Sequence, residues 1–202
     1  TKLKQRNLEE SVFMVANLTK VAALATLVLS SAQGIAGPKD QAKMMHNRLT
    51  GVPPSPSVLQ EMTDLIEEGD AVGAAEVAME DENFYRVTVK DMVTKWTNVD
   101  EKNDQPLNDY TATAIGFIRD GKPFNELLYT TEIYTAADGT NVPAYSPQNN
   151  DHYEQFENNG LSYKTQLVSR QQSQVTGIGV AAGIYTTRAF GAAYYDAGTN
   201  RR

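Results

Sequence analysis

The pattern of an amphipathic helix runs through LNDYTATAIGFIRDG, residues 107–121. Asn108 or Asp109 can cap its first turn, because both side chains accept hydrogen bonds from backbone N–H groups that lack an intrahelical partner. Gly121 can end the helix in the left-handed conformation. The apolar residues recur at intervals of three and four, and the expected buried face carries Tyr110, Ala114, Phe117 and Ile118. The segment therefore predicts a helix that packs on one side.

Four more helices are expected before this segment: at 38–50, from 56 to the stop at Gly69, at 71–79, and at 83–96. The first ends at Gly51, and the prolines of VPPSPS cannot continue it because they lack a backbone N–H. Ser55 can cap the second helix and Asp70 the third. The β-branched residues of YRVTV, residues 85–89, would suit a strand. The apolar spacing of the longer segment favours a helix.

The chain after residue 121 is expected to be less regular. KPFNELLY predicts a short helix with Phe124, Leu127 and Leu128 facing inward. Residues 135–150 contain glycine, prolines and paired asparagines, which are typical of a long loop or a domain boundary. Residues 151–170 predict a weakly amphipathic helix, GIGVAAG a flexible turn, and the last segment a helix capped by Thr186 or Thr187.

These elements predict a mainly α fold, an irregular multi-helix domain with short helices and long polar loops. We expect a helical domain at 38–134, a loop or boundary at 135–150, and a truncated C-terminal helical segment at 151–202. A chain of 202 residues has room for one ordinary domain and a second small lobe.

The first 36 residues differ from the rest. Residues 14–36 begin with a methionine and combine a lysine, an apolar run at 21–29 and the small residues SSAQGIAG, which is the pattern of a secretory signal peptide. The alternative, a membrane-spanning helix, needs about 20 apolar residues, and this run is much shorter. Residues 1–13 resemble an upstream or non-native leader. We therefore predict export to the periplasm or cell surface, with no membrane span after cleavage.

Composition excludes several kinds of site. The net charge is −7, and an acidic surface repels phosphate backbones, so nucleic-acid binding is not expected. The absence of cysteine rules out disulfides, a CxxCH haem attachment and zinc–thiolate sites in this chain. No cofactor is therefore expected here. A cysteine-free exported domain fits a bacterial envelope protein.

The histidines and acidic runs give no catalytic or metal-binding motif. His46 and His152 lack a partner at metal-binding spacing, so we expect both on the solvated surface. The alternatives are a divalent-cation site at His152 with its acidic neighbours, and an axial haem ligand at His46. EDEN (residues 80–83) and DEKND (residues 100–104) are interpreted as helix-end and loop charges. GIGVAAG lacks the strand that precedes a dinucleotide-binding loop. No catalytic residue and no metal ligand is assigned.

Three stretches resemble, in order, segments of one protein group. They are RLTGVPPSPSVLQEM at 48–62, LNDYTATAIGFIRDGKPFNELLY at 107–129 and GVAAGIYTTRAFGAAYYDAGTNRR at 179–202. The group consists of secreted bacterial domains of unknown function of the planctomycete type, associated with c-type cytochromes. Its members are usually longer and often carry, or are encoded beside, a CxxCH module. The resemblance implies that this chain is the N-terminal fragment of a longer protein, with c-type haem possible in a missing C-terminal part.

The leading hypothesis is an exported docking or scaffolding module whose partner is a cytochrome module or another envelope protein. Whether the chain is an enzyme is left open. One alternative is a hydrolase that acts on a polymer through paired carboxylates, which must lie about 5–10 Å apart. The other is a carbohydrate- or envelope-binding module with coplanar exposed aromatic rings. Its candidate residues include Tyr85, Tyr110, Tyr129 and Tyr194.

Overall fold

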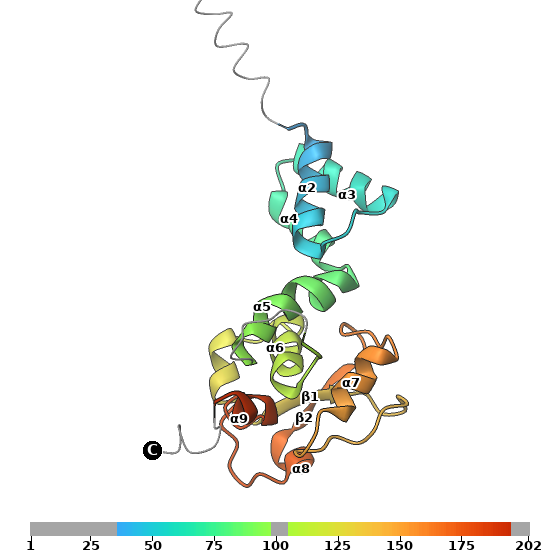
Figure 1. The fold of residues 1–202 in the computed structure, drawn as a ribbon. Coiled ribbons are helices and arrows are strands. Elements are labelled where there is room, and N and C mark those ends of the chain that lie inside the picture. The colour runs from blue at the N-terminus through green and yellow to red at the C-terminus, as the bar shows by residue number, and fades with distance from the viewer. Residues whose placement is uncertain (1–35, 98–104, 195–202) are drawn as a thin grey trace, which may run out of the picture.

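The computed structural model describes residues 36–97 and 105–194. It shows two lobes joined by a helical segment (Figure 1). The expected leader at 1–13, residues 14–35 of the expected signal peptide and the DEKND run lie outside the described residues. Among those described, the fold is mainly α with short helices and one two-stranded sheet, which confirms the predicted fold class. No helix in these two ranges is long and apolar enough to cross a membrane.

The N-terminal lobe contains three helices in the predicted places. They are α2 (Pro38–Thr50), α3 (Pro56–Glu67) and α4 (Ala71–Met79). Ser55 caps α3 by accepting from the Val58 N–H, and Asp70 caps α4 by accepting from the Gly73 N–H. Gly51 ends α2 with a φ of 76°, the left-handed conformation that favours glycine. The helices pack closely because three of the four buried core residues are alanines: Ala42, Met62, Ala74 and Ala78.

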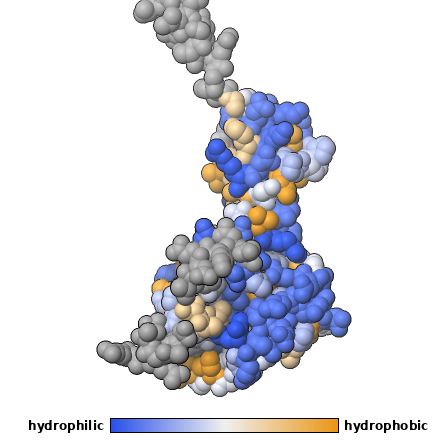
Figure 2. Space-filling model, viewed as in Figure 1, coloured by the Kyte–Doolittle hydropathy of each residue, from blue (hydrophilic) through white to orange (hydrophobic). Residues whose placement is uncertain are grey.

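A continuous helical segment joins the lobes. It consists of the π-helix η2 (Phe84–Val89), α5 (Lys90–Thr94) and the 3₁₀-helix η3 (Lys95–Thr97). The preference for a helix over a strand in YRVTV is confirmed, although the turns there are wider than α-helical turns. Thr88 donates a hydrogen bond of 2.7 Å to the Leu49 carbonyl at the end of α2. Figure 2 shows this segment as a narrow waist between two larger masses.

Helix α6 (Asp109–Arg119) is the centre of the C-terminal lobe. Nine of its eleven residues, from Asp109 to Phe117, are buried, so it is enclosed on more sides than the predicted stripe implied. Alanines, threonines and a glycine make this possible, because small side chains let neighbouring elements approach closely. Asn108 is the N-cap and accepts from the Thr111 N–H at 2.9 Å. Of the two caps expected, Asn108 is therefore the one used.

The remaining elements of the lobe surround α6. They are η4 (Phe124–Leu128), β1 (Glu132–Ala136), α7 (Asp151–Asn158), β2 (Leu167–Gln171), α8 (Gln172–Thr176) and α9 (Arg188–Tyr194). The predicted cap of the last helix is confirmed, since Thr187 accepts from the Phe190 N–H. The prediction that Phe124, Leu127 and Leu128 face inward from η4 is wrong in part, because only Leu127 is buried and the other two are exposed.

The sheet was not predicted. β1 and β2 pair antiparallel, from Glu132 opposite Gln171 to Ala136 opposite Leu167. The last two residues of β1 fall in the expected loop, and residues 167–170 of β2 fall in the expected helix. Those expectations are wrong at the two strands. Residues 137–150 form the expected loop, and α7 begins at the expected place. One cluster of buried apolar residues extends from Tyr85 to Ala189 and includes residues on both sides of this loop, whereas the separate cluster of the N-terminal lobe ends at Ala78.

Side chains occupy the second edge of β1. The Tyr134 N–H donates to Thr113 Oγ1 at 3.2 Å, and the Ala136 N–H donates to His152 Nε2 at 3.0 Å. The Tyr153 hydroxyl donates to the Tyr134 carbonyl at 2.8 Å. The buried backbone groups of this edge are thus satisfied by α6 and α7 instead of a third strand.

Glu157 fixes α7 against the joining segment. Its carboxylate lies 2.5 Å from Lys90 Nζ and accepts from the Leu107 N–H at 2.6 Å and from the Tyr163 hydroxyl. Burial raises the pKa of Glu157, but these hydrogen bonds outweigh that effect, so its pKa is lower than usual in the folded protein.

Acidification is therefore expected to remove stability at Glu157. Because its folded pKa is below the ordinary value of 4.5, the contribution is present at neutral pH and is lost as pH falls through the folded pKa. Glu157→Gln should lower the free energy of unfolding at neutral pH by about 1–3 kcal/mol and should make the decline in acid shallower. Urea unfolding from neutral pH to about pH 3 measures both effects.

Glu154→Gln is the matched control, because Glu154 lies on the same helix and is exposed. Its curve of stability against pH should follow the unsubstituted protein. If Glu157→Gln also followed that curve, the carboxylate at 157 would have no part in acid stability.

Candidate functional site

Both histidines are buried, so the prediction of solvated surface positions is wrong. His46 is 1% exposed and His152 is 6% exposed. His46 Nδ1 lies 2.9 Å from the Val52 carbonyl, and its Nε2 lies 3.7 Å from Asp81 Oδ2. The side chain thus holds the turn after α2 close to the segment that leads into the joining helix. Both ring nitrogens therefore face protein groups.

His152 has an equally defined structural role. Its Nε2 accepts from the Ala136 N–H, so Nδ1 carries the proton and donates to the Pro143 carbonyl at 2.6 Å. Burial lowers the pKa of His152, against the opposing effect of the Pro143 hydrogen bond. The described residues contain no group of three potential metal ligands, at His152 or elsewhere. The ring therefore acts as a neutral link between β1 and the loop.

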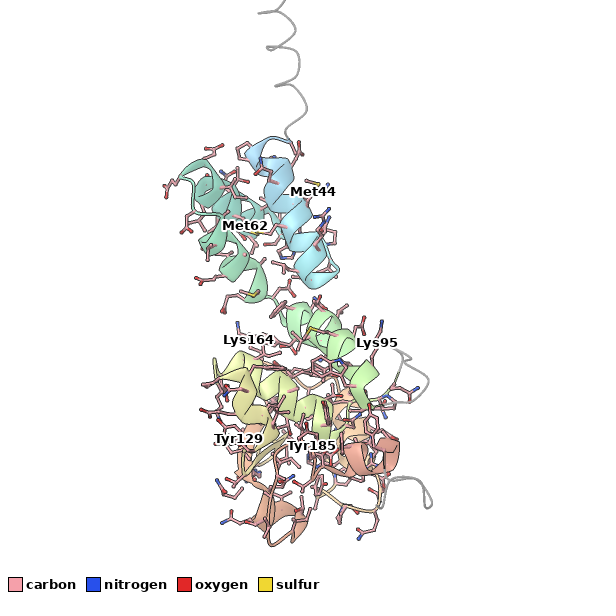
Figure 3. All side chains as sticks on the ribbon, turned by 90° about the vertical axis from the view of Figure 1, so that its left-hand side faces the viewer. Met44, Met62, Lys95, Tyr129, Lys164 and Tyr185 are labelled. Atoms are coloured by element: carbon pink, nitrogen blue, oxygen red, sulfur yellow. The ribbon has the colours of Figure 1, made fainter. Side chains whose placement is uncertain are left out.

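The EDEN residues connect segments distant in sequence. Glu82 accepts from the Tyr163 N–H at 2.6 Å and from the Ser162 hydroxyl at 2.6 Å. Glu80 pairs with Lys164 (Figure 3 labels this lysine). Three pockets among the described residues each have a single carboxylate in their walls, respectively Asp138, Glu154 and Asp40. This arrangement gives no support to hydrolysis by paired carboxylates.

The glycines of GIGVAAG have a backbone role. Gly177 ends α8 with a φ of 74°. Gly183 is buried with a φ of 54°, and its N–H donates to the Thr130 carbonyl at 2.9 Å. A Cβ at Gly183 would lie 2.2 Å from the Leu127 carbonyl oxygen. Close packing against η4 therefore accounts for Gly183.

An exposed apolar surface is the first candidate site. It consists of Trp96, Phe124, Leu128, Tyr129, Tyr185 and Tyr194, whose exposed fractions lie between 38% and 61%. We call these six residues the apolar surface. Figure 3 shows Tyr129 and Tyr185 in the lobe below the segment that carries Lys95. Sequence reasoning singled out Tyr129 and Tyr194 but placed Phe124 and Leu128 in the core.

Ring contacts and a hydrogen bond link three elements across the apolar surface. The Trp96 and Phe124 ring centroids are 6.2 Å apart, and the Tyr194 hydroxyl donates to the Trp96 carbonyl at 2.9 Å. Phe190 lies 5.0 Å from the Tyr185 ring and 4.7 Å from the Tyr194 ring. The surface is thus built by η3, η4 and the segment around α9.

A carbohydrate-binding module was expected to present coplanar exposed aromatic rings. Trp96 and Phe124 meet at 64° and Tyr185 and Phe190 at 80°, so neither pair forms the coplanar arrangement that was expected for that function. Tyr85 and Tyr110 are buried, whereas Tyr129 and Tyr194 are exposed. The surface is uneven and apolar, which suits contact with another protein.

The second candidate is a cavity beneath the loop of residues 137–150. Its volume is about 360 Å³, and its walls include Val142, Tyr145, His152 and Arg170. We call it the loop cavity. One feature of the sequence points to it, since a polar segment of this length without secondary structure is often functional. Arg170 is the one residue of β2 in the cavity wall, and it was missed because residues 151–170 were expected to form a helix.

Comparisons with known protein families, curated proteins and solved structures find no match to this chain.

Proposed function

We propose that this chain is an exported docking module of a larger envelope protein, and that its partner is a c-type cytochrome module. The observation that carries the docking role is the apolar surface. Isolated exposed apolar residues are ordinary, but a connected group with tryptophan and tyrosine is typical of protein–protein contact. The partner and the export rest on the sequence resemblance and the signal-peptide pattern.

The character of the surface favours docking over catalysis. Tryptophan and tyrosine provide large contact areas and dominate the energetics of many interfaces. The described pockets bring no two carboxylates together, and both histidines are engaged by backbone or neighbouring side chains. A binding role needs none of these groups to be reactive.

The test begins with the native gene product. Haem staining and an absorption spectrum should show c-type haem in it or in a protein that co-purifies with it. The haem-bearing domain is then titrated with the chain, and Phe124→Ser/Leu128→Ser should weaken binding at least about tenfold. Both side chains are half-exposed, so the substitution should leave the fold intact.

Val72→Ser is the matched control, because Val72 is exposed on the other lobe. It should bind as the unsubstituted chain does. Two results would overturn the proposal: a native product with no haem and no haem-bearing companion, or equal binding by the double variant and the control.

A further inference from the structure

The loop cavity is preformed. Residues 137–150 lead from β1 to α7, and residues of this loop line the cavity together with the end of β1, Arg170 of β2 and Val175 of α8. A volume of about 360 Å³ is within the range of small-molecule sites. This space stays open only where the loop is held in place.

Side-chain hydrogen bonds fix the loop along its length. His152 donates to the Pro143 carbonyl at 2.6 Å, and Asn159 donates to the Asn141 carbonyl at 2.8 Å. The Tyr145 hydroxyl donates to buried Asp109 at 3.0 Å. Thr140 donates to the Ala137 carbonyl at 2.7 Å within the loop. Such a compact, pinned loop is a common form of binding loop.

The walls of the cavity are mostly apolar with one cation. Ala136, Val142, Pro143 and Val175 contribute apolar groups. Arg170 enters from β2 and donates through Nε to Thr135 Oγ1 at 3.0 Å. This bond fixes the orientation of the guanidinium group.

The ion pair of Arg170 is open to exchange. Its Nη2 donates to Asp138 Oδ1 at 2.6 Å, but the Asp138 side chain is 92% exposed, compared with 33% for Arg170. An ion pair with so exposed a carboxylate adds little stability because water screens it. A carboxylate within the cavity would be less hydrated and could take the same position on the guanidinium fork.

We propose that the loop cavity binds a small organic carboxylate with an apolar body. The ligand carboxylate replaces Asp138 on Arg170, and the apolar body contacts Val142, Pro143 and Val175. The cavity is a binding site and not a reaction centre, because both ring nitrogens of His152 are already engaged. This site is separate from the apolar surface, so it does not depend on the docking function.

The test uses phenylacetate as the probe and the chain as it exists. Titration followed by amide NMR should shift the signals of Gly139, Thr140 and Val142. Arg170→Gln should weaken binding at least about tenfold, the usual effect of removing a charge-assisted pair. Asp138→Asn should strengthen binding a few-fold, because it removes the competing carboxylate. A general loss of structure would not produce opposite changes at these two positions.

Phenylacetamide and phenethylamine separate charge recognition from apolar contact, and both should bind much more weakly than phenylacetate. Lys164→Gln is the protein control, since this lysine is as exposed as Arg170 and pairs with Glu80 away from the cavity. It should bind phenylacetate normally. The proposal fails if phenylacetate causes no local shifts at millimolar concentration, if phenylacetamide binds equally well, or if folded Arg170→Gln keeps full affinity.

Discussion

Replacing Asp109 by alanine is expected to lower the free energy of unfolding by about 3–5 kcal/mol, because it leaves several buried hydrogen-bond donors without an acceptor and each of these costs about 1–3 kcal/mol. Asp109 is fully buried at the start of α6. Its Oδ1 accepts from the Tyr110 and Ala189 N–H groups, and its Oδ2 accepts from the Arg188 N–H and the Tyr145 hydroxyl. Alanine would leave these donors without an acceptor. Urea unfolding followed by circular dichroism measures the change.

Asp109→Asn distinguishes the acceptor role from simple loss of packing. Asparagine has nearly the same shape, but it replaces one accepting oxygen with an NH₂ group that faces two donors. We expect a loss intermediate between the unsubstituted protein and Asp109→Ala. Asp138→Ala, at an exposed carboxylate, should change stability by no more than about 0.5 kcal/mol. A similarly small effect of Asp109→Ala would show that the carboxylate does not hold α9 to α6.

The role of Asp109 also marks a limit of sequence reasoning. The capping rule identified Asn108 or Asp109, and the structure uses Asn108 as the cap. Asp109 instead accepts from the first residues of α9, 79 and 80 positions later in the chain. A rule about neighbouring residues can find the cap, but it contains no information on which distant backbone groups a carboxylate will meet.

Helices in the N-terminal lobe were predictable because their signals are local. Ser55 and Asp70 cap, Gly51 ends a helix, and the apolar positions repeat at helical spacing. The strands carry no comparable signal. β1 and β2 have five residues each, and 30 residues of the chain separate the end of β1 from the start of β2. Side chains of α6 and α7 stabilise the free edge of β1. Their pairing depends on tertiary contacts.

In the candidate sites, too, local sequence signals do not reveal the tertiary contacts. His46 and His152 lack partners at metal-binding spacing, which led to the prediction of surface positions. Each is instead buried and hydrogen-bonds groups of neighbouring segments. The length of the polar loop hinted at a site. The cation of that site lies on an unpredicted strand, so Arg170 could not be connected with the loop. The exposure of Phe124 was missed as well, and the 3₁₀ geometry of η4 does not explain it, because residues 124 and 127 share a face in such a helix.

Gly116→Ala is expected to destabilise the protein by at least about 2 kcal/mol, although alanine is the better helix former by about 1 kcal/mol. A Cβ at Gly116 would lie 2.1 Å from Cδ1 and 2.3 Å from Cε1 of the Tyr134 ring. Overpacking a core usually costs about 1–3 kcal/mol and sometimes more. Thermal or urea unfolding provides the measurement.

The Tyr134 ring has little freedom to move away. It is fully buried, its hydroxyl donates to Asp120, and Phe117 packs against it with centroids 6.1 Å apart. The Arg119 guanidinium also lies over this ring, 5.5 Å from its centroid. The new methyl group must therefore displace α6 from β1, which are the two elements at the centre of the lobe.

A double-mutant cycle separates this clash from a general effect of the substitution. Tyr134→Ala removes the ring and should itself cost about 3–5 kcal/mol. In that background Gly116→Ala should no longer destabilise and should restore some stability through its helix propensity. Gly179→Ala, where an added Cβ meets nothing within 4 Å, should be close to neutral. Additive losses at residues 116 and 134 would mean that the two do not meet as the structure places them, and the close packing of α6 on β1 would have to be reconsidered.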